Sequence, residues 1–238
     1  MSQLSSSSNQ LLTSLPAPDY DRIRAFLEPV PLSLGQVLYE PNQSIEYAYF
    51  PLSAVVSLLN EMEGGYRVET AAVGNEGMIG VPLVLGTADI PMRAIVQIAG
   101  EALRIPAKAL QAELSNGQTL YLLLLRYIQT LMSQISQNLA CTRLHTAQER
   151  CCYLLLLTQD RIGLAELSLT HEVLSRMVGV RRDSIGGIVT TLARAGLVQH
   201  QRGRITILDR LGLEAAACEC YRIVRSEFDR VLNDRGEG

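Results

Sequence analysis

One short segment constrains the fold more than any other part of the sequence. Residues 169–189 read LTHEVLSRMVGVRRDSIGGIV. Thr170 can cap a first helix by accepting a hydrogen bond from a backbone N–H two or three residues further on. Gly179 supplies the left-handed residue that a tight corner between two helices needs. We predict a first helix that ends at residue 177 or 178 and a second that begins near Arg181 and ends before Gly196.

The apolar residues of this segment fall where two such helices would pack against each other. Ser175 provides the small side chain that is needed where the helices cross. The shared core would be formed by Leu174, Val178, Val180, Ile185 and Ile188. An unrelated helical hairpin is the alternative. Such a hairpin would not require a small residue at the crossing and apolar residues at all five of the core positions. The segment therefore predicts a helix-turn-helix.

A β-hairpin is predicted directly after the second helix. Its strands are the runs Leu197–His200 and Ile205–Leu208, joined by Gln-Arg-Gly-Arg, in which the glycine fits a hairpin turn. Such hairpins also occur in proteins that never touch DNA. Beside a helix-turn-helix, however, the hairpin is typical of a wing that holds His200, Arg202 and Arg204 against the DNA backbone.

Charge is distributed unevenly along the chain. The net charge is −3, which by itself does not point to nucleic acid. Between residues 170 and 204, however, six arginines stand against only two acidic residues, Glu172 and Asp183. This local basic surplus suits contact with phosphates. A solvated charged face is the alternative, and charge alone does not decide between the two.

The first turn of the second predicted helix carries residues suited to reading base pairs. In a helix-turn-helix this turn meets base edges in the major groove. Arg181 and Arg182 can donate paired hydrogen bonds to guanine, and Asp183 can accept one from cytosine or simply complement the helix dipole. Ser184 and Thr170 are better placed for phosphates. The predicted DNA-binding residues are Thr170, Arg181, Arg182, Asp183, Ser184, Gly187, His200, Arg202 and Arg204.

Two adjacent glycines, Gly186 and Gly187, interrupt the second predicted helix. Each costs about 1 kcal/mol relative to alanine in a helix interior. Close approach of the helix backbone to DNA is one reason for keeping them.

The N-terminal half is dominated by short runs of β-branched and aromatic residues. A helix over residues 19–27, ended by Pro29 and Pro31, is expected before them. Turn residues such as Gly64 and Gly65 separate the runs at a spacing typical of an antiparallel sandwich or barrel. The predicted strands are Gln36–Tyr39, Tyr47–Phe50, Val55–Leu59, Arg67–Val73, Ala94–Ile98 and Ala102–Ile105. Together with the helices they predict an α+β fold.

Residues 118–145 contain no glycine or proline, and Pro106 to Ala109 opens the helical region before them, which predicts a long helix. A stripe with alternating steps of four and three residues follows this helix, as in a coiled coil. We interpret the stripe as the seam of a homodimer, formed by Leu124, Ile128, Leu131, Ile135, Asn138 and Thr142. Three other leucines would then face the sheet, namely Leu122, Leu123 and Leu125. A single chain that buries the stripe against its own sheet is the alternative.

The remaining composition indicates a globular, cytoplasmic protein. Hydrophobic residues make up 47% of the chain and charged residues 19%. The most apolar stretch, residues 120–132, is too short to span a bilayer. The Ser-rich N-terminus lacks the pattern of a signal peptide, and residues 1–18 are expected to form a disordered tail.

Five cysteines lie in the last hundred residues: Cys141, Cys151, Cys152, Cys218 and Cys220. Without a secretory signal they are expected to be reduced. Cys218 and Cys220 lack the two-residue spacer usual for zinc, and no second ligand pair is expected near them. We therefore favour helical packing over a metal or redox function, and predict neither a metal nor a cofactor.

In this order, the elements resemble the family of the cyclic-AMP receptor protein and the anaerobic regulator Fnr, from about residue 19 to the end. The stretches most similar to one branch of that family are residues 145–150, 169–172, 178–182 and 202–210. The resemblance implies a cyclic-nucleotide-binding-type β-roll (jelly roll) over residues 19–117, a dimerisation helix over 118–146 and a winged helix-turn-helix over 147–238. It also implies a homodimer on a palindromic promoter site, with recognition helices about 34 Å apart.

The β-roll departs from the nucleotide-binding members of this family. Those members grip ribose and phosphate with a Gly-Glu-Leu segment and an Arg-Ser or Arg-Thr pair, and here Val81 replaces the Glu and Met92 the Arg. Arg93 is one place off, which turns it to the opposite face of a strand. We therefore expect no ordinary cyclic-AMP binding. The candidate effector pocket comprises Gly77, Gly80, Val81, Met92 and Arg93.

Other family features are also missing. No cysteine precedes Cys141, so the N-terminal iron–sulfur cluster of one branch is not expected. The three histidines, His145, His171 and His200, all lie beyond the sensor, so haem ligation there is not expected either. The usual Arg-Glu…Arg triplet becomes Arg182-Asp183…Gly187, which predicts a different target site.

We predict a transcription regulator whose partners are double-stranded DNA and a second copy of the chain, with a small-molecule effector and RNA polymerase as candidates. A β-roll and helix module that has lost DNA binding is the alternative, and the arginines of the winged motif argue against it. No Ser–His–Asp, paired-carboxylate or metal-ligand grouping assembles from the motifs. An enzyme is therefore not expected, and His171 and Glu172 should be solvated.

Overall fold

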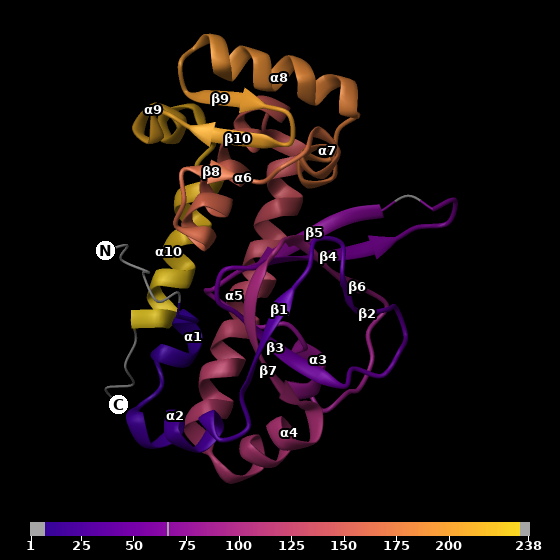
Figure 1. The fold of residues 1–238 in the computed structure, drawn as a ribbon, viewed down its shortest axis with the longest axis vertical. Coiled ribbons are helices and arrows are strands. Elements are labelled where there is room, and N and C mark those ends of the chain that lie inside the picture. Colours follow the sequence, from indigo (N-terminus) through magenta and orange to yellow (C-terminus); the bar gives the residue numbers. More distant parts are fainter. Residues whose placement is uncertain (1–7, 66, 234–238) are drawn as a thin grey trace.

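The computed structural model describes residues 8–65 and 67–233, and it contains two modules joined by a long helix. In Figure 1 the β-rich module lies at the lower right, and the module that follows helix α5 (Gln118–Leu144) lies at the top. The last helix, α10 (Cys220–Asn233), returns from the upper module and packs along α5. Within the described residues, no helix is long and apolar enough to cross a membrane.

The remaining elements divide between the two modules. The N-terminal module contains α1 (Gln10–Thr13), α2 (Ala17–Arg24), β1 (Glu28–Leu32), β2 (Val37–Tyr39), β3 (Tyr47–Pro51), β4 (Val55–Glu61), β5 (Arg67–Val73), α3 (Val81–Val84), β6 (Arg93–Ile98), β7 (Gly100–Pro106) and α4 (Ala107–Asn116). The C-terminal module contains α6 (Ala147–Ile162), β8 (Glu166–Leu167), α7 (His171–Val178), α8 (Arg182–Arg194), β9 (Val198–Gln201), β10 (Arg204–Ile207) and α9 (Arg210–Ala216).

The N-terminal module is built from two antiparallel sheets. Their strand orders are β1-β7-β3 and β2-β6-β4-β5. The six predicted strands are all present, with ends within two residues of the prediction. Side chains such as Phe50, Val56 and Ile105 are fully buried and form part of the core. The α+β class is confirmed.

Strand β1 was not predicted. Helix α2 ends at Arg24, and the prolines that were expected to end it, Pro29 and Pro31, lie within β1 instead. The strand pairs only with β7, at the edge of its sheet. Proline is tolerated there because an edge strand pairs on one side only. With two prolines among its five residues, the sequence of β1 does not have the pattern typical of a strand.

The expected disordered tail over residues 1–18 is wrong from Asn9 onward, while residues 1–7 lie outside the described part. The Asn9 side chain donates hydrogen bonds to the carbonyls of Pro51 (3.0 Å) and Gly77 (2.9 Å) and caps α1. Leu11 and Leu12 are 1% and 2% exposed. The segment is therefore pinned to the β-rich module by buried apolar side chains and by a satisfied buried amide.

The stripe assigned to a dimer seam faces the chain's own core. Leu124 and Leu131 on α5 are buried within the single chain, and Asn138 donates a hydrogen bond to the Thr70 carbonyl of β5 (3.0 Å). Helix α5 packs against both β5 and α10, so two of its faces are covered. Leu122, which was expected to face the sheet, is exposed. Leu124 and Leu131 therefore cannot lie in a seam between two chains, whereas Leu123 and Leu125 are half-buried and pack against the core.

A buried ion pair joins the two modules. Arg161 Nε on α6 lies 2.8 Å from Glu76 Oε1 in the β-rich module. Glu76 also accepts from the Gly74 N–H at 3.0 Å. A Cβ at position 74 would lie only 2.6 Å from Arg161 Cγ, so Gly74 allows the close approach of the Arg161 side chain.

Candidate DNA interface

The predicted helix-turn-helix is formed by α7 and α8. The Thr170 hydroxyl accepts a hydrogen bond from the Val173 N–H at 3.2 Å and caps α7. Gly179 has φ 71° and ends this helix, in the left-handed region that glycine adopts at little cost. Leu174 and Ile185 are fully buried between the two helices. Helix α8 begins at Arg182, one residue after the predicted start.

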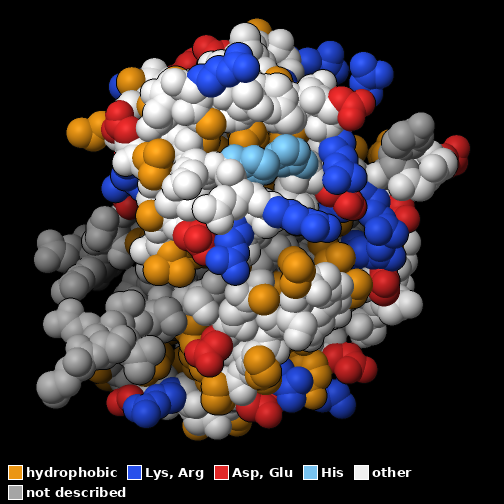
Figure 2. Space-filling model, turned by 45° about the horizontal axis from the view of Figure 1, so that its top comes forward, with side chains coloured by type: hydrophobic (Ala, Val, Ile, Leu, Met, Phe, Trp, Pro, Cys, Tyr) orange, Lys and Arg blue, Asp and Glu red, His pale blue; other side chains and the backbone are white. Residues whose placement is uncertain are grey.

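Helix α8 presents its first turn to solvent. Arg181, Arg182, Asp183 and Ser184 are all exposed. Among the described residues, no ion pair involves either arginine, so both guanidinium groups can donate to another molecule. Figure 2 shows Lys and Arg side chains around the histidine side chains that are visible on this end of the molecule. This surface carries the positive charge that the binding of a polyanion requires.

Gly187 opens directly to solvent on α8, because nothing lies within 4 Å of the position that a Cβ would take. Packing within the chain therefore does not require this glycine. The Thr191 hydroxyl donates to the Gly187 carbonyl at 3.0 Å, and Thr190 does the same to Gly186 at 2.8 Å. These bonds add links along the helix where glycine weakens it. Close approach to DNA as the reason for Gly187 stays a prediction.

The wing is the predicted hairpin with one additional strand. Arg204 pairs with Gln201 in register, so Arg202 and Gly203 form a two-residue turn, with Gly203 at φ 77°. β8 adds to the other side of β10 and was not predicted. Arg202 extends from the exposed tip, whereas Arg204 Nη1 lies 3.2 Å from Glu166 Oε1 on β8. Both side chains of this pair are largely exposed, so the pair is weak.

His171 is half-buried rather than solvated as expected. Its ring stacks on that of His200 with 4.6 Å between the centroids. Burial lowers the pKa of His171, and the nearby charges of His200 and Arg182 lower it further. The stack joins the start of α7 to β9 of the wing. Glu172 is exposed, as expected, and pairs with Arg176 at 3.0 Å.

Arg150 holds the helix-turn-helix against α5 and was missed by the sequence argument. This buried side chain donates to the Val178 carbonyl at the end of α7 (2.6 Å) and to the Thr142 carbonyl at the end of α5 (3.0 Å). Its neighbour Glu149 completes a capping box with Thr146 at the start of α6. The Thr-x-x-Glu-Arg sequence was the available signal.

The candidate effector residues lie at two places in the β-rich module. Gly77 packs against the Tyr127 ring of α5, and Gly80, with φ 103°, precedes Val81 at the start of α3. Met92 is half-buried just before β6. Arg93 Nε lies 2.6 Å from Glu40 Oε2, and Arg93 Nη2 lies 3.6 Å from Glu61 Oε2. The one cation of this group is therefore already paired.

The comparisons agree with this geometry. The family model for a Crp-like helix-turn-helix domain matches residues 149–216. A regulator of the CRP/FNR family from Thermus thermophilus is 25% identical, with 80% of this chain and 98% of that chain covered and a TM-score of 0.54. A putative regulator of the crp/fnr family from Eubacterium rectale is 18% identical, with 87% and 96% covered and a TM-score of 0.65. A search of curated proteins found no match.

A third solved structure with this fold is the c-di-GMP responsive regulator CLP of Xanthomonas campestris. It is 15% identical, with 82% of this chain and 100% of that chain covered and a TM-score of 0.65. A β-roll, a long helix and a winged helix-turn-helix in this order define a class of DNA-binding transcription regulators. Residues 149–216 match the Crp-like helix-turn-helix domain, and the chain shares its overall fold with regulators of the Crp/Fnr family. These matched proteins are regulators rather than enzymes.

Proposed function

We propose that the chain regulates transcription as a homodimer that binds a palindromic DNA site. The observation that carries the proposal is the exposed basic first turn of α8, placed beside the basic tip of the wing. In this motif the first turn enters the major groove and the wing follows the backbone. The alternative, an interaction module that has lost DNA binding, predicts no mobility shift with any DNA.

The arginines of the two elements have different roles in this proposal. Arg182 lies in the turn that faces base edges and reads one base pair in each half-site. Arg202 and Arg204 contact phosphates, which position the protein without reading sequence. The Arg204–Glu166 pair opens or is shared when the phosphate binds.

Arg182→Ala is expected to weaken binding to the preferred site by about 1–3 kcal/mol and to blur one base pair per half-site. Arg204→Ala should weaken binding to all sequences alike and reduce the number of counterions released on binding by about one. Titrations with preferred and scrambled duplexes at several salt concentrations separate the two effects. Arg222→Ala on α10 is the control and should change neither. An unchanged affinity and preference in Arg182→Ala would mean that α8 is not the recognition helix.

The homodimer uses an exposed stripe on α5 in this proposal. Its steps of three and four residues match a coiled-coil seam. Leu122, Met132 and Leu139 are 46%, 63% and 64% exposed in the single chain. The whole stripe consists of Leu122, Leu125, Gln129, Met132, Ser136 and Leu139. It lies on a different face from the buried stripe that includes Leu124 and Leu131.

We further propose that the β-roll does not bind cyclic AMP. A cyclic phosphate keeps its charge when buried, and a buried charge without a partner costs several kcal/mol. Val81 and Met92 carry no charge, and Arg93 is held by Glu40 and Glu61. Turning Arg93 toward a ligand would leave Glu40 without its cation, while Glu61 would keep its pair with Arg67.

Calorimetry with cyclic AMP should therefore show no binding at physiological concentrations, and cyclic AMP should not change DNA affinity. A micromolar dissociation constant coupled to tighter DNA binding would overturn this proposal. Cyclic dinucleotides are the next probes, since one regulator with the same fold is responsive to c-di-GMP.

A further inference from the structure

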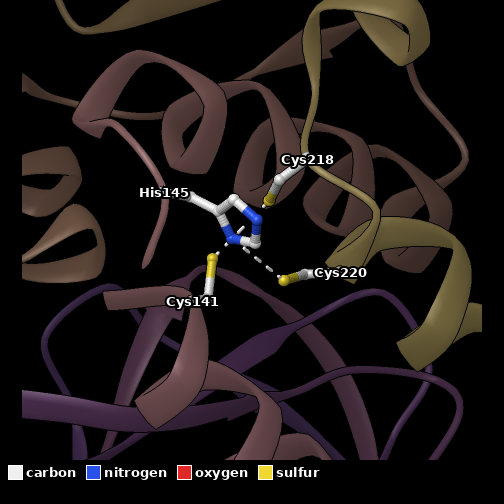
Figure 3. Close-up of side chains that lie close together, drawn as sticks. All are labelled: Cys141, His145, Cys218 and Cys220. Carbon is white, nitrogen blue, oxygen red and sulfur yellow. Dashed lines mark hydrogen bonds between the residues drawn. The ribbon is translucent and has the colours of Figure 1, made fainter. Parts of the chain in front are cut away.

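Four potential metal ligands meet where the long helix gives way to the DNA-binding module. Cys141 and His145 lie at the end of α5, Cys218 lies between α9 and α10, and Cys220 opens α10. Their ligand atoms all lie within 4.8 Å of one another. Figure 3 shows the four side chains converging from the two segments on a common centre. The expectation that Cys218 and Cys220 have no second ligand pair nearby is therefore corrected.

We propose that Cys141, His145, Cys218 and Cys220 bind one zinc ion that fastens the end of α5 to the start of α10. Three cysteines and one histidine are a common ligand set of structural zinc sites, in which the protein supplies all four tetrahedral ligands. The ion would fix the direction in which the chain leaves α5 for the DNA-binding module. The site is separate from the DNA-binding residues and from the β-roll.

The distances fit a single tetrahedral ion. With zinc bonds of about 2.3 Å to sulfur and about 2.0–2.1 Å to nitrogen, two sulfurs should lie about 3.8 Å apart and a sulfur and a nitrogen about 3.6 Å apart. Cys141 Sγ and Cys218 Sγ are 3.6 Å apart, and Cys220 Sγ and His145 Nδ1 are 3.5 Å apart. An iron–sulfur cluster would divide four ligands among two or more irons, so ligand atoms on different irons would lie farther apart than the 4.8 Å within which all four lie here.

Groups around the cluster orient the ligands. His145 Nε2 lies 3.1 Å from Glu219 Oε2, which leaves Nδ1 with its lone pair toward the centre. A carboxylate on the second nitrogen is the usual support of a zinc-bound histidine. The Gln137 amide also donates a hydrogen bond to Cys220 Sγ at 3.1 Å. Donors to sulfur favour the thiolate, which is the form that binds metal.

Burial separates this site from an ordinary surface cluster. Cys141, Cys218 and Cys220 are 2%, 6% and 0% exposed, so three polar sulfurs and an imidazole share one enclosed space. A disulfide between Cys141 and Cys218 would require their sulfurs to approach to about 2.05 Å. It would also leave His145, Cys220 and Glu219 without a role.

Cys151 supplies a matched control. It is fully buried on α6 and lies outside the cluster. Burial raises the pKa of its thiol to about 12, so it remains a neutral, inert thiol. Cys151→Ser replaces sulfur by oxygen, as the substitutions of the ligand cysteines do, but at a position outside the cluster. It should therefore leave the metal content unchanged.

Elemental analysis of the full-length chain, purified without an affinity tag or chelator, tests the proposal. Wild type and Cys151→Ser should contain one zinc per chain, and Cys141→Ser and Cys220→Ser almost none. Cobalt substitution of wild type should give the sulfur-to-cobalt charge-transfer bands of a tetrahedral thiolate site, which keeps the test decisive if the variants fail to fold. His145→Gln should weaken zinc binding at least 10-fold.

Two results would overturn the proposal. One is a wild-type chain that holds no zinc as purified and gives no cobalt bands after reduction and reconstitution. The other is a Cys141–Cys218 disulfide, found by mass spectrometry of the chain purified under anaerobic conditions. Metal content is measured on the free protein, so neither result depends on whether DNA binds.

Discussion

Arg161→Met is expected to lower the free energy of unfolding by about 3–5 kcal/mol, because it leaves a buried carboxylate without its cation. The Arg161 and Glu76 side chains are only 6% and 10% exposed. Methionine keeps most of the apolar stem that packs on Gly74 but provides no charge. Urea denaturation at one fixed protein concentration measures the loss, since stability of a dimer depends on concentration.

Two further variants show whether the buried charge is responsible. The double variant Glu76→Leu/Arg161→Leu should recover most of the loss, because it removes both charges and fills the space with apolar atoms. Glu172→Ala breaks the exposed pair with Arg176 and should cost at most about 1 kcal/mol. A loss below 1 kcal/mol in Arg161→Met would show that the pair does not hold the modules together.

The double variant Met132→Lys/Leu139→Lys is expected to be monomeric at micromolar concentration. In a symmetric dimer each substitution would place two charges opposite each other in an apolar seam, at a large cost. Both positions are more than 60% exposed in the single chain, so the monomer should remain folded. Because a monomer binds only one half-site, its DNA affinity should be about 10²–10⁴-fold lower than that of the dimer. Sedimentation velocity and DNA titration measure the two effects.

The matched controls are two other leucines. Leu211→Lys on α9 changes an exposed leucine away from the stripe, with 78% of its surface exposed, and should leave the dimer intact. Leu131→Lys places a charge at a buried position of α5 and should unfold the chain instead of dissociating it. A wild-type chain that sediments as a monomer, or a double variant that stays dimeric, would contradict the proposed seam.

The strands and the helix-turn-helix could be predicted because their signals are local. The β-branched run that forms β4, the cap at Thr170 and the left-handed corner at Gly179 each depend on a few neighbouring residues. β1 was missed because its two prolines are compatible only with an edge position. That position is set by pairing with β7, more than sixty residues further along the chain.

The face of α5 could not be assigned because the helix carries two interleaved apolar stripes. The choice between them depends on α10, whose own apolar stripe of Tyr221, Val224, Phe228 and Val231 was the signal available in the sequence. Phe228 packs near Tyr127 of α5, with 6.5 Å between the ring centroids. The return of α10 along α5 also brings Cys218 and Cys220 to Cys141. No spacing rule for neighbouring residues could reveal that cluster.

Selection of binding sites from random duplex DNA, followed by footprinting of the selected site, tests the central claim most directly. We expect an inverted repeat whose half-sites are about one helical turn, or 10–10.5 base pairs, apart. Wild type should protect both half-sites, and Arg182→Ala should lose preference at one base pair in each. Selected sequences without a shared motif, or no protection of any of them, would contradict the account.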